Sequence, residues 1–288
     1  MNIKKPILLD GAMGTELINR GVEIPLPVWS ANANLFHSEI VKDIHRDYIL
    51  SGADVITTNT FRTTTWTYKK TGSSLKDSRD LARNSLYKAV ECAHQVKESN
   101  VKIAGSITSI DDCYHPEKFP GRHIADDIYG ETLEWIIDAG VDFVIFETMG
   151  NYEEIKSAFS LGKSYDMGFW ISIIMKDHDT ILDGTNINDV FSLLKLYSVE
   201  CLLTNCNQMN TTLRTCEKFR NHWEGQWGAY PNLGITEYEN DYFEIIDEPN
   251  FIDGIKSILM KDPYVIGICC GSNPQHIGQL NKLIKLEE

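Results

Sequence analysis

Short apolar runs, each about as long as one β-strand, recur along the whole chain, and segments with helical periodicity separate them. The runs lack the alternation of a half-exposed strand, which favours parallel strands covered on both faces. Between two of them, Ile40, Val41, Ile44 and Tyr48 fall on one helical stripe. The predicted strands are 6–11, 53–61, 101–108, 141–148, 168–175, 200–206, 227–232 and 264–271. The predicted helices are 38–50, 79–98, 126–139, 151–164, 188–197, 211–222, 250–260 and 274–286.

Eight alternating units within 288 residues predict an α/β fold, a (β/α)8 TIM barrel. A doubly wound parallel sheet is the alternative, but it would normally use fewer strands. No low-complexity linker or block of charge divides the chain, so we expect a single domain over 1–288. Segments 30–34 and 111–120 are rich in Asn, Asp, Pro and Gly and are predicted to be loops.

Charge and cysteine content limit the class of protein. A net charge of −14 does not match nucleic-acid binding or an anionic membrane surface, because both require clustered basic residues. No apolar run approaches the length of a membrane span. Seven cysteines, an odd number scattered along a long chain, do not resemble a disulfide framework. We therefore expect a cytoplasmic protein in a reducing compartment, and its oligomeric state is not indicated.

Polar residues end the predicted strands. In a (β/α)8 barrel, catalytic residues lie at the C-terminal ends of the strands. Two of the polar residues are carboxylates, Asp10 and Glu147, which are costly to bury without partners. We expect them to face a common site or to cap the helices that follow their strands. The strand-end residues are Asp10–Gly11, Thr58–Asn59, Ser106, Glu147–Thr148, Asn205–Cys206, Pro231–Asn232 and Cys269–Gly271.

Three of the cysteines lie at strand ends. Cys206 ends the sixth run, and Cys269 and Cys270 are adjacent at the end of the eighth, between Gly267 and Gly271. Adjacent side chains in a regular strand point to opposite faces, so both thiols reach one ion only if the backbone turns, which the glycines permit. Three thiolates with an open fourth position form a catalytic zinc site. An ordinary buried pair or a vicinal disulfide is the alternative. The remaining cysteines are treated as structural: Cys92, Cys113, Cys201 and Cys216.

An ordered set of short motifs resembles the homocysteine S-methyltransferase family. No single motif is specific, but together they span nearly the whole chain in the order of the family. They are LLDGAMGTEL (8–17), WSANAN (29–34), HRDYILSGADVITTNTF (45–61), FET (146–148), NC (205–206), YPN (230–232) and GICCGSNPQHI (267–277).

The resemblance implies a (β/α)8 barrel in which Cys206, Cys269 and Cys270 bind Zn²⁺. A free thiol, with a pKa of about 8.5, is mostly protonated at neutral pH, whereas a thiol bound to zinc is deprotonated. The implied activity is transfer of a methyl group to the thiol of homocysteine, which forms methionine. No catalytic residue is implied beyond that activated substrate thiolate.

The resemblance also implies where homocysteine binds. Its amino-acid end would lie near Asp10 and Glu147, and the backbone around Gly11–Thr15 would receive its carboxylate. Asn205 is expected among the residues that surround the substrate. Asn232 is expected to line the site or to hold the metal before the substrate arrives.

The implied methyl donor is a sulfonium, S-methylmethionine or also S-adenosylmethionine. The expected barrel uses essentially all 288 residues, which leaves no length for the modules of cobalamin-dependent methionine synthases or for the C-terminal extension of betaine-using relatives. A betaine-type donor, a barrel that binds zinc or thiols without turnover, and a different barrel enzyme with structural cysteines stay open. Loop residues that would hold a cationic donor, or that simply form the surface, are Trp66, Tyr68, Asp111, Asp112 and Tyr114.

Overall fold

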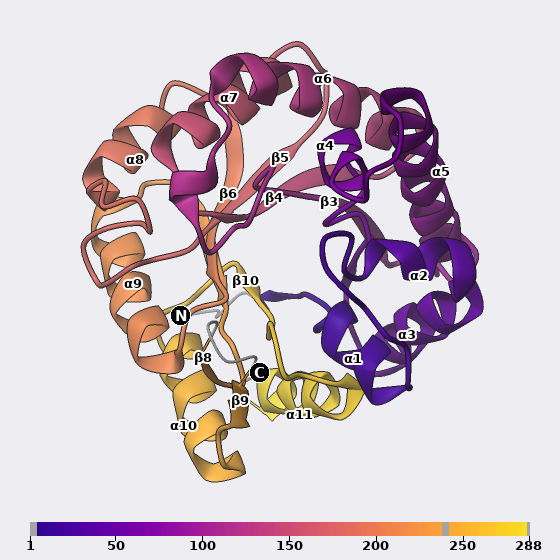
Figure 1. The fold of residues 1–288 in the computed structure, drawn as a ribbon. Coiled ribbons are helices and arrows are strands. Elements are labelled where there is room, and N and C mark those ends of the chain that lie inside the picture. Colours follow the sequence, from indigo (N-terminus) through magenta and orange to yellow (C-terminus); the bar gives the residue numbers. More distant parts are fainter. Residues whose placement is uncertain (1–4, 238–241, 287–288) are drawn as a thin grey trace.

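The computed structural model describes residues 5–237 and 242–286, and eight parallel strands form its central barrel, as expected (Figure 1). The strands follow the order β1-β10-β7-β6-β5-β4-β3-β2, and a parallel bridge between Leu9 and Val55 closes the ring. The strands are β1 (Ile7–Leu8), β2 (Val55–Thr57), β3 (Lys102–Thr108), β4 (Phe143–Met149), β5 (Phe169–Ile173), β6 (Val199–Asn205), β7 (Gln226–Tyr230) and β10 (Val265–Ile266). A separate antiparallel pair, β8 (Gly234–Glu237) and β9 (Tyr242–Ile245), was not predicted.

Helices surround the barrel and cover its outer face (Figure 1). Each predicted helix is present, with ends shifted by a few residues, and the short helices α1, α2 and α4 are additional. The helices are α1 (Met13–Asn19), α2 (Ala31–Phe36), α3 (Ser38–Leu50), α4 (Thr65–Lys69), α5 (Leu75–His94), α6 (Arg122–Asp138), α7 (Tyr152–Gly162), α8 (Ile187–Leu194), α9 (Met209–His222), α10 (Glu248–Leu259) and α11 (Pro274–Leu286). No helix among the described residues combines the length and the apolar character that crossing a bilayer requires.

The apolar core has two layers because successive strand residues point to opposite faces. One buried cluster fills the barrel interior, where the rings of Phe143 and Trp170 lie 4.3 Å apart between centroids. A larger cluster packs between the strands and the helices, and Phe146, Phe159 and Phe169 belong to it. Burial on both faces explains why the strands read as continuous apolar runs.

The segment 30–34 is not a loop, contrary to expectation, because α2 begins at Ala31 and ends at Phe36. The Asn34 side chain is fully buried there, and its Nδ2 donates to the carbonyl oxygen of Asn59 at 2.8 Å and to Ser85 Oγ at 3.0 Å. Asn normally favours turns because its side chain bonds its own backbone. Here distant segments supply the partners, so the local composition predicts the wrong structure. The other predicted loop, 111–120, contains only one turn of 3₁₀ helix, Pro116–Lys118.

The close contact between β7 and β10 leads to a first prediction. A Cβ added at Gly228 would lie 2.3 Å from the carbonyl oxygen of Val265 and 2.7 Å from its Cβ. Replacing Gly228 by Ala must therefore separate the two strands, and overpacking of this kind costs about 1–3 kcal/mol. We expect Gly228→Ala to lower the midpoint of thermal unfolding by several degrees.

Gly278→Ala is the matched control, because a Cβ on this residue of α11 meets no atom within 4 Å. Ala is a better helix former than Gly by roughly 0.5–1 kcal/mol, so this variant should unfold at the same or a slightly higher temperature. Equal midpoints for the two variants would contradict the prediction, because β7 and β10 would then accommodate the added Cβ without loss of stability.

Candidate functional site

A cavity of about 720 Å³ lies at the C-terminal ends of the strands. This is the end of a (β/α)8 barrel at which catalytic residues lie. Asp10, Glu147 and Cys206, which come from three different strand ends, all line it. The strand-end residues of its wall are Leu9–Thr15, Thr57–Asn59, Ser106, Glu147–Thr148, Asn205–Cys206, Tyr230 and Ile268–Cys270.

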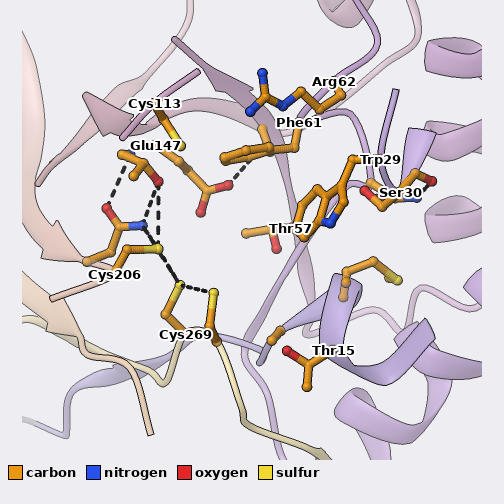
Figure 2. Close-up of a pocket in the computed structure, with 18 of the residues that line it drawn as sticks. Thr15, Trp29, Ser30, Thr57, Phe61, Arg62, Cys113, Glu147, Cys206 and Cys269 are labelled. Atoms are coloured by element: carbon orange, nitrogen blue, oxygen red, sulfur yellow. Dashed lines mark hydrogen bonds between the residues drawn. The ribbon is translucent and has the colours of Figure 1, made fainter. Parts of the chain in front are cut away.

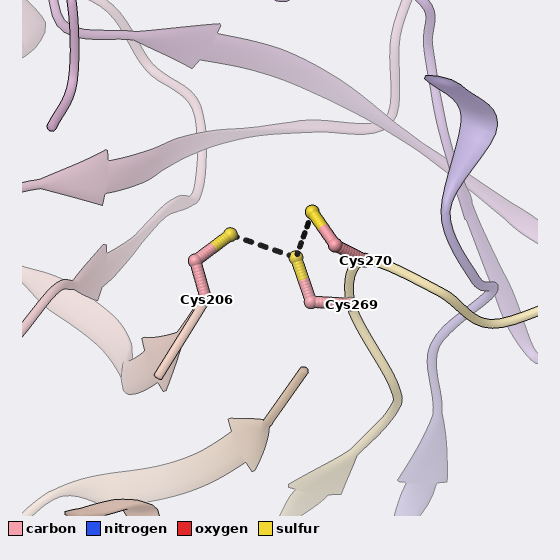
Figure 3. Close-up of side chains that lie close together, drawn as sticks. All are labelled: Cys206, Cys269 and Cys270. Atoms are coloured by element: carbon pink, nitrogen blue, oxygen red, sulfur yellow. Dashed lines mark hydrogen bonds between the residues drawn. The ribbon is translucent and has the colours of Figure 1, made fainter. Parts of the chain in front are cut away.

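The three cysteines predicted to meet at one point do so (Figure 3). Their Sγ atoms all lie within 4.8 Å of one another, with Cys206 at 2.8 Å from Cys269 and Cys269 at 3.9 Å from Cys270. All seven cysteines of the chain are free thiols, so the adjacent pair is not a disulfide. Three soft sulfur ligands from two strand ends can hold a metal ion and leave a position open.

Of the two glycines expected to let the backbone turn at the cysteines, Gly271 adopts a positive φ and Gly267 does not. Ladder pairing of β10 ends at Ile266, and Gly271 then adopts a φ of +84° just beyond the cysteines. Gly267 instead allows close packing, because a Cβ there would lie 2.8 Å from Leu9 Cβ. Cys206 itself has a φ of 54°, a left-handed conformation that is uncommon for a residue with a side chain. Such strain is typical of functional sites.

The electrostatics of the cluster favour a cation. Hydrogen bonding with Cys206, and then with Cys269, holds the pKa of Cys270 well below its ordinary range. Hydrogen bonding with Cys269, together with Cys270 and burial, holds the pKa of Cys206 well above that range. Without a cation, the ionisation of one thiol therefore opposes the ionisation of its neighbours. A divalent cation would allow all three to ionise, so the donor set fits a metal.

The side-chain amides of Asn205 and Asn232 both hydrogen-bond to Cys206. Asn205 Nδ2 donates to Cys206 Sγ at 3.3 Å and to Thr148 Oγ1 at 2.9 Å, and its Oδ1 accepts from Thr148 N at 3.2 Å. Asn232 is 1% exposed and lies outside the cavity wall, and its Nδ2 donates to the carbonyl oxygen of Cys206 at 3.0 Å. Its Oδ1 is buried without a hydrogen-bond partner among the described residues. Both amides thus hold the strained Cys206 in place.

Asp10 and Glu147 form an acidic pair on the same wall. Asp10 Oδ2 accepts from Thr57 N at 2.8 Å and its Oδ1 from Thr57 Oγ1 at 3.0 Å. Glu147 accepts from Ser106 Oγ and, at 3.0 Å, from the Tyr230 hydroxyl. Burial raises the pKa of both carboxyl groups, and the charge of Glu147 raises that of Asp10 further. Two buried carboxylates beside an open cavity are suited to bind an ammonium group.

Neither carboxylate caps a helix, so that alternative is wrong. The N-cap of α1 is Ala12, which makes no side-chain cap hydrogen bond, and the N-cap of α7 is Asn151. The stretch Gly11–Thr15 lines the cavity, and helix α1 begins within it. Thr15 Oγ1 accepts from Gly271 N at 3.1 Å, which joins this turn to the cysteine loop.

Aromatic side chains that were not among the predicted site residues form another wall of the cavity. Trp29 and Phe61 line the cavity with ring centroids 5.7 Å apart, and Arg62, the next residue after Phe61, also lines it (Figure 2). Both aromatics lie inside the quoted motifs, but the motif alone does not show which way a loop side chain points. Cys113, predicted to be structural, also lines the cavity, and burial raises its pKa to about 12.

Two of the five loop residues expected near a cationic donor, Asp112 and Tyr114, line the cavity, and three do not. Tyr68 is 2% exposed and packs in the outer core. Trp66 Nε1 donates to Asp111 Oδ2 at 2.9 Å, so these two side chains bind each other outside the cavity wall. Trp66 and Tyr68 lie on helix α4 (Thr65–Lys69) and not, as the sequence had suggested, in a loop.

The chain is similar to proteins of one family. A family model described as homocysteine S-methyltransferase matches residues 7–284. The homocysteine S-methyltransferase of Escherichia coli (strain K12) is 26% identical, over 95% of this chain and 94% of the relative. Homocysteine S-methyltransferase YbgG of Bacillus subtilis (strain 168) is also 26% identical, over 95% of this chain and 93% of the relative. The crystal structure of homocysteine methyltransferase MmuM from Escherichia coli in its metallated form shares the fold, with a TM-score of 0.84 and 24% identity, over 97% of this chain and 96% of that one.

The raised pKa of Glu147 leads to a prediction about stability. The ordinary pKa of this carboxyl group is 4.5, and burial raises the pKa in the folded protein. The protonated group therefore contributes stability that is fully present below pH 4.5, and this contribution is lost as the pH rises through the raised pKa. Glu147→Gln removes the ionisation. With both proteins free of metal, we expect the variant to unfold at a higher temperature than the parent at about pH 8. The two unfolding temperatures should become equal below about pH 4.

The control is Glu134→Gln, which removes an exposed carboxylate on α6 and should change the unfolding temperature little at either pH. A Glu147→Gln variant that is less stable than the parent at pH 8 would contradict the assignment, because it would make Glu147 a structural acceptor.

Proposed function

The chain belongs to the homocysteine S-methyltransferase family, and on that basis we propose that it transfers a methyl group from a sulfonium donor to the thiol of L-homocysteine, which forms methionine. We take S-methylmethionine as the main donor and S-adenosylmethionine as a second one. The observation that carries the proposal is the Cys206–Cys269–Cys270 cluster on the same cavity wall as the Asp10–Glu147 pair. A thiol-binding metal site thus lies beside a site for an amino group.

The metal in this proposal is zinc, held by Cys206, Cys269 and Cys270. All three thiols face one point, and a relative of the same fold has a metallated form. When bound, zinc would act as a Lewis acid that keeps the homocysteine thiol ionised at neutral pH. The amide of Asn205 donates toward two of the sulfurs, at 3.3 Å from Cys206 and 4.0 Å from Cys269, and so helps to stabilise their negative charge.

The acceptor is oriented by its amino-acid end. Asp10 and Glu147 bind the ammonium group of homocysteine, and the amide groups of Gly11–Thr15 receive its carboxylate, since the first turn of α1 has no side-chain cap. Asn205 contacts the sulfur end. A contact between Asn232 and the substrate stays a prediction. In the structure, Asn232 Nδ2 donates to the carbonyl oxygen of Cys206.

The methyl donor is a cation, and the cavity offers it π faces and negative charge. Trp29 and Phe61 present their rings to the sulfonium, and Asp112 adds a carboxylate that Lys118 pairs with at 3.5 Å. As the bond between the methyl carbon and the homocysteine sulfur forms, the bond between the methyl carbon and the donor sulfur breaks. Its electron pair stays on the donor sulfur, so a neutral thioether leaves.

We infer one homocysteine-binding barrel domain over 1–288, a cytoplasmic location and small-molecule substrates, without nucleic acid or membrane partners. Betaine is the alternative donor, and its quaternary ammonium suits the same aromatic wall. A barrel that binds zinc or thiols without turnover is the alternative to an enzyme.

The metal assignment predicts the effect of removing single thiols. We expect Cys206→Ser and Cys270→Ser to lose bound zinc, measured by mass spectrometry of the metal. Methionine formation should fall by more than about 100-fold, because a direct ligand matters more than its outer partners. The circular dichroism spectrum should stay that of the parent.

Cys92→Ala is the control, since Cys92 is a buried thiol on α5 outside the cluster. This variant should keep its zinc even if it is less stable. Normal turnover by Cys206→Ser or Cys270→Ser would rule out the assignment.

The donor is tested with a panel. Purified protein is mixed with homocysteine and S-methylmethionine, S-adenosylmethionine or betaine, and methionine is quantified before and after treatment with a chelator. We expect the highest rate with S-methylmethionine, loss of that rate on chelation and recovery on adding zinc. Retained zinc without product from any donor would favour the barrel that only binds.

A further inference from the structure

The Arg62 guanidinium lines the cavity and carries a charge that no described carboxylate pairs with. Its Nη1 donates to the carbonyl oxygen of Asp111. Its Nε is buried and has no hydrogen-bond partner among residues 5–237 and 242–286. A buried donor without an acceptor is rare in folded proteins, so the residues around this guanidinium leave its hydrogen bonding incomplete.

The acidic residues nearest in sequence to that contact are already paired with lysines. The carboxylate of Asp111 pairs with Lys70, and that of Asp112 pairs with Lys118 at 3.5 Å. Asp111 accepts from Arg62 through its backbone carbonyl oxygen and not through its carboxylate. The positive charge at the cavity wall is therefore left for a bound molecule.

Aromatic rings fix where this charge lies. Arg62 Cζ is 5.8 Å from the centroid of the Phe61 ring, and Phe61 in turn packs on Trp29. Figure 2 shows the Phe61 ring between Arg62 and the sulfur atoms of Cys206 and Cys269. Arg62 thus lies beyond the aromatic wall, away from the cluster that would hold the acceptor sulfur.

We propose that Arg62 binds the carboxylate of the methyl donor, and that it selects donors that carry an anionic group beside their cationic methyl centre. This inference rests on the proposed function. A guanidinium without a counter-ion repels a purely cationic donor, whereas it attracts the carboxylate of a zwitterion. Its planar fork also matches a carboxylate, and such a charge-assisted pair is stronger than a neutral hydrogen bond. The cationic sulfur is then directed toward the rings and the thiolates.

The test compares donors with and without a carboxylate. S-methylmethionine carries one, and trimethylsulfonium does not. We expect Arg62→Gln to raise the KM for S-methylmethionine about 10- to 100-fold, the loss typical of a charge-assisted hydrogen bond. The KM for homocysteine should not change, and kcat/KM for trimethylsulfonium should stay equal or rise because a repulsive charge is gone. Arg62→Lys should restore part of the S-methylmethionine affinity.

Arg46→Gln is the control, since Arg46 is an exposed residue of α3 that pairs with Asp43. An equal loss with both donors, or a loss confined to homocysteine, would overturn the inference while turnover by the parent keeps the proposed function. A parent protein that transfers no methyl group contradicts the proposed function. Titration calorimetry then decides the inference: weaker binding of S-methylmethionine to Arg62→Gln supports it, and equal binding overturns it.

Discussion

Closure of the barrel between β1 and β2 is the constraint on which the site depends. The bridge from Leu9 to Val55 completes the ring, and the next amide, Asp10 N, donates to the Val55 carbonyl oxygen at 2.9 Å. The Asp10 carboxylate then accepts from Thr57 N at 2.8 Å. The last contacts of the ladder thus lead directly into the first contacts of the site. If these two strands separated, Asp10 would lose both its orientation and its place beside Glu147.

The site concentrates negative charge that the fold itself does not neutralise. Burial raises the pKa of Asp10 and Glu147, and hydrogen bonding among the thiols raises the pKa of Cys206 and lowers that of Cys270. The same low-dielectric surroundings strengthen attraction to a cation that enters. The cost to stability and the attraction of the site for a cation therefore have one physical origin. In the role that we propose for Arg62, its positive charge would let such a site distinguish zwitterions from simple cations.

Much of the fold and half of the site follow from local pattern. Fully buried parallel strands leave an apolar run, and each run ends where the chain meets the cavity, so the positions of Asp10, Glu147 and the three cysteines could be predicted. The aromatic wall could not. Trp66 and Tyr68 were named as aromatic candidates from the sequence, but both lie on α4 outside the cavity wall, whereas Trp29 and Phe61, which were not named, line it. Asn34 was assigned to a loop because its partners, Asn59 and Ser85, are far away in sequence.

The sequence by itself determined the alternation of strands and helices, the family and the places where thiols and carboxylates end strands, because these depend on residue type and short-range periodicity. Only the tertiary structure decided that the Sγ atoms of Cys206 and Cys269 lie 2.8 Å apart and that Arg62 donates to the backbone carbonyl oxygen of Asp111 and not to its carboxylate. Those outcomes depend on contacts such as the one from Gly271 to Thr15, which joins residues 256 positions apart. A side chain's direction at a strand end is set by such long-range contacts, and local pattern carries no record of them.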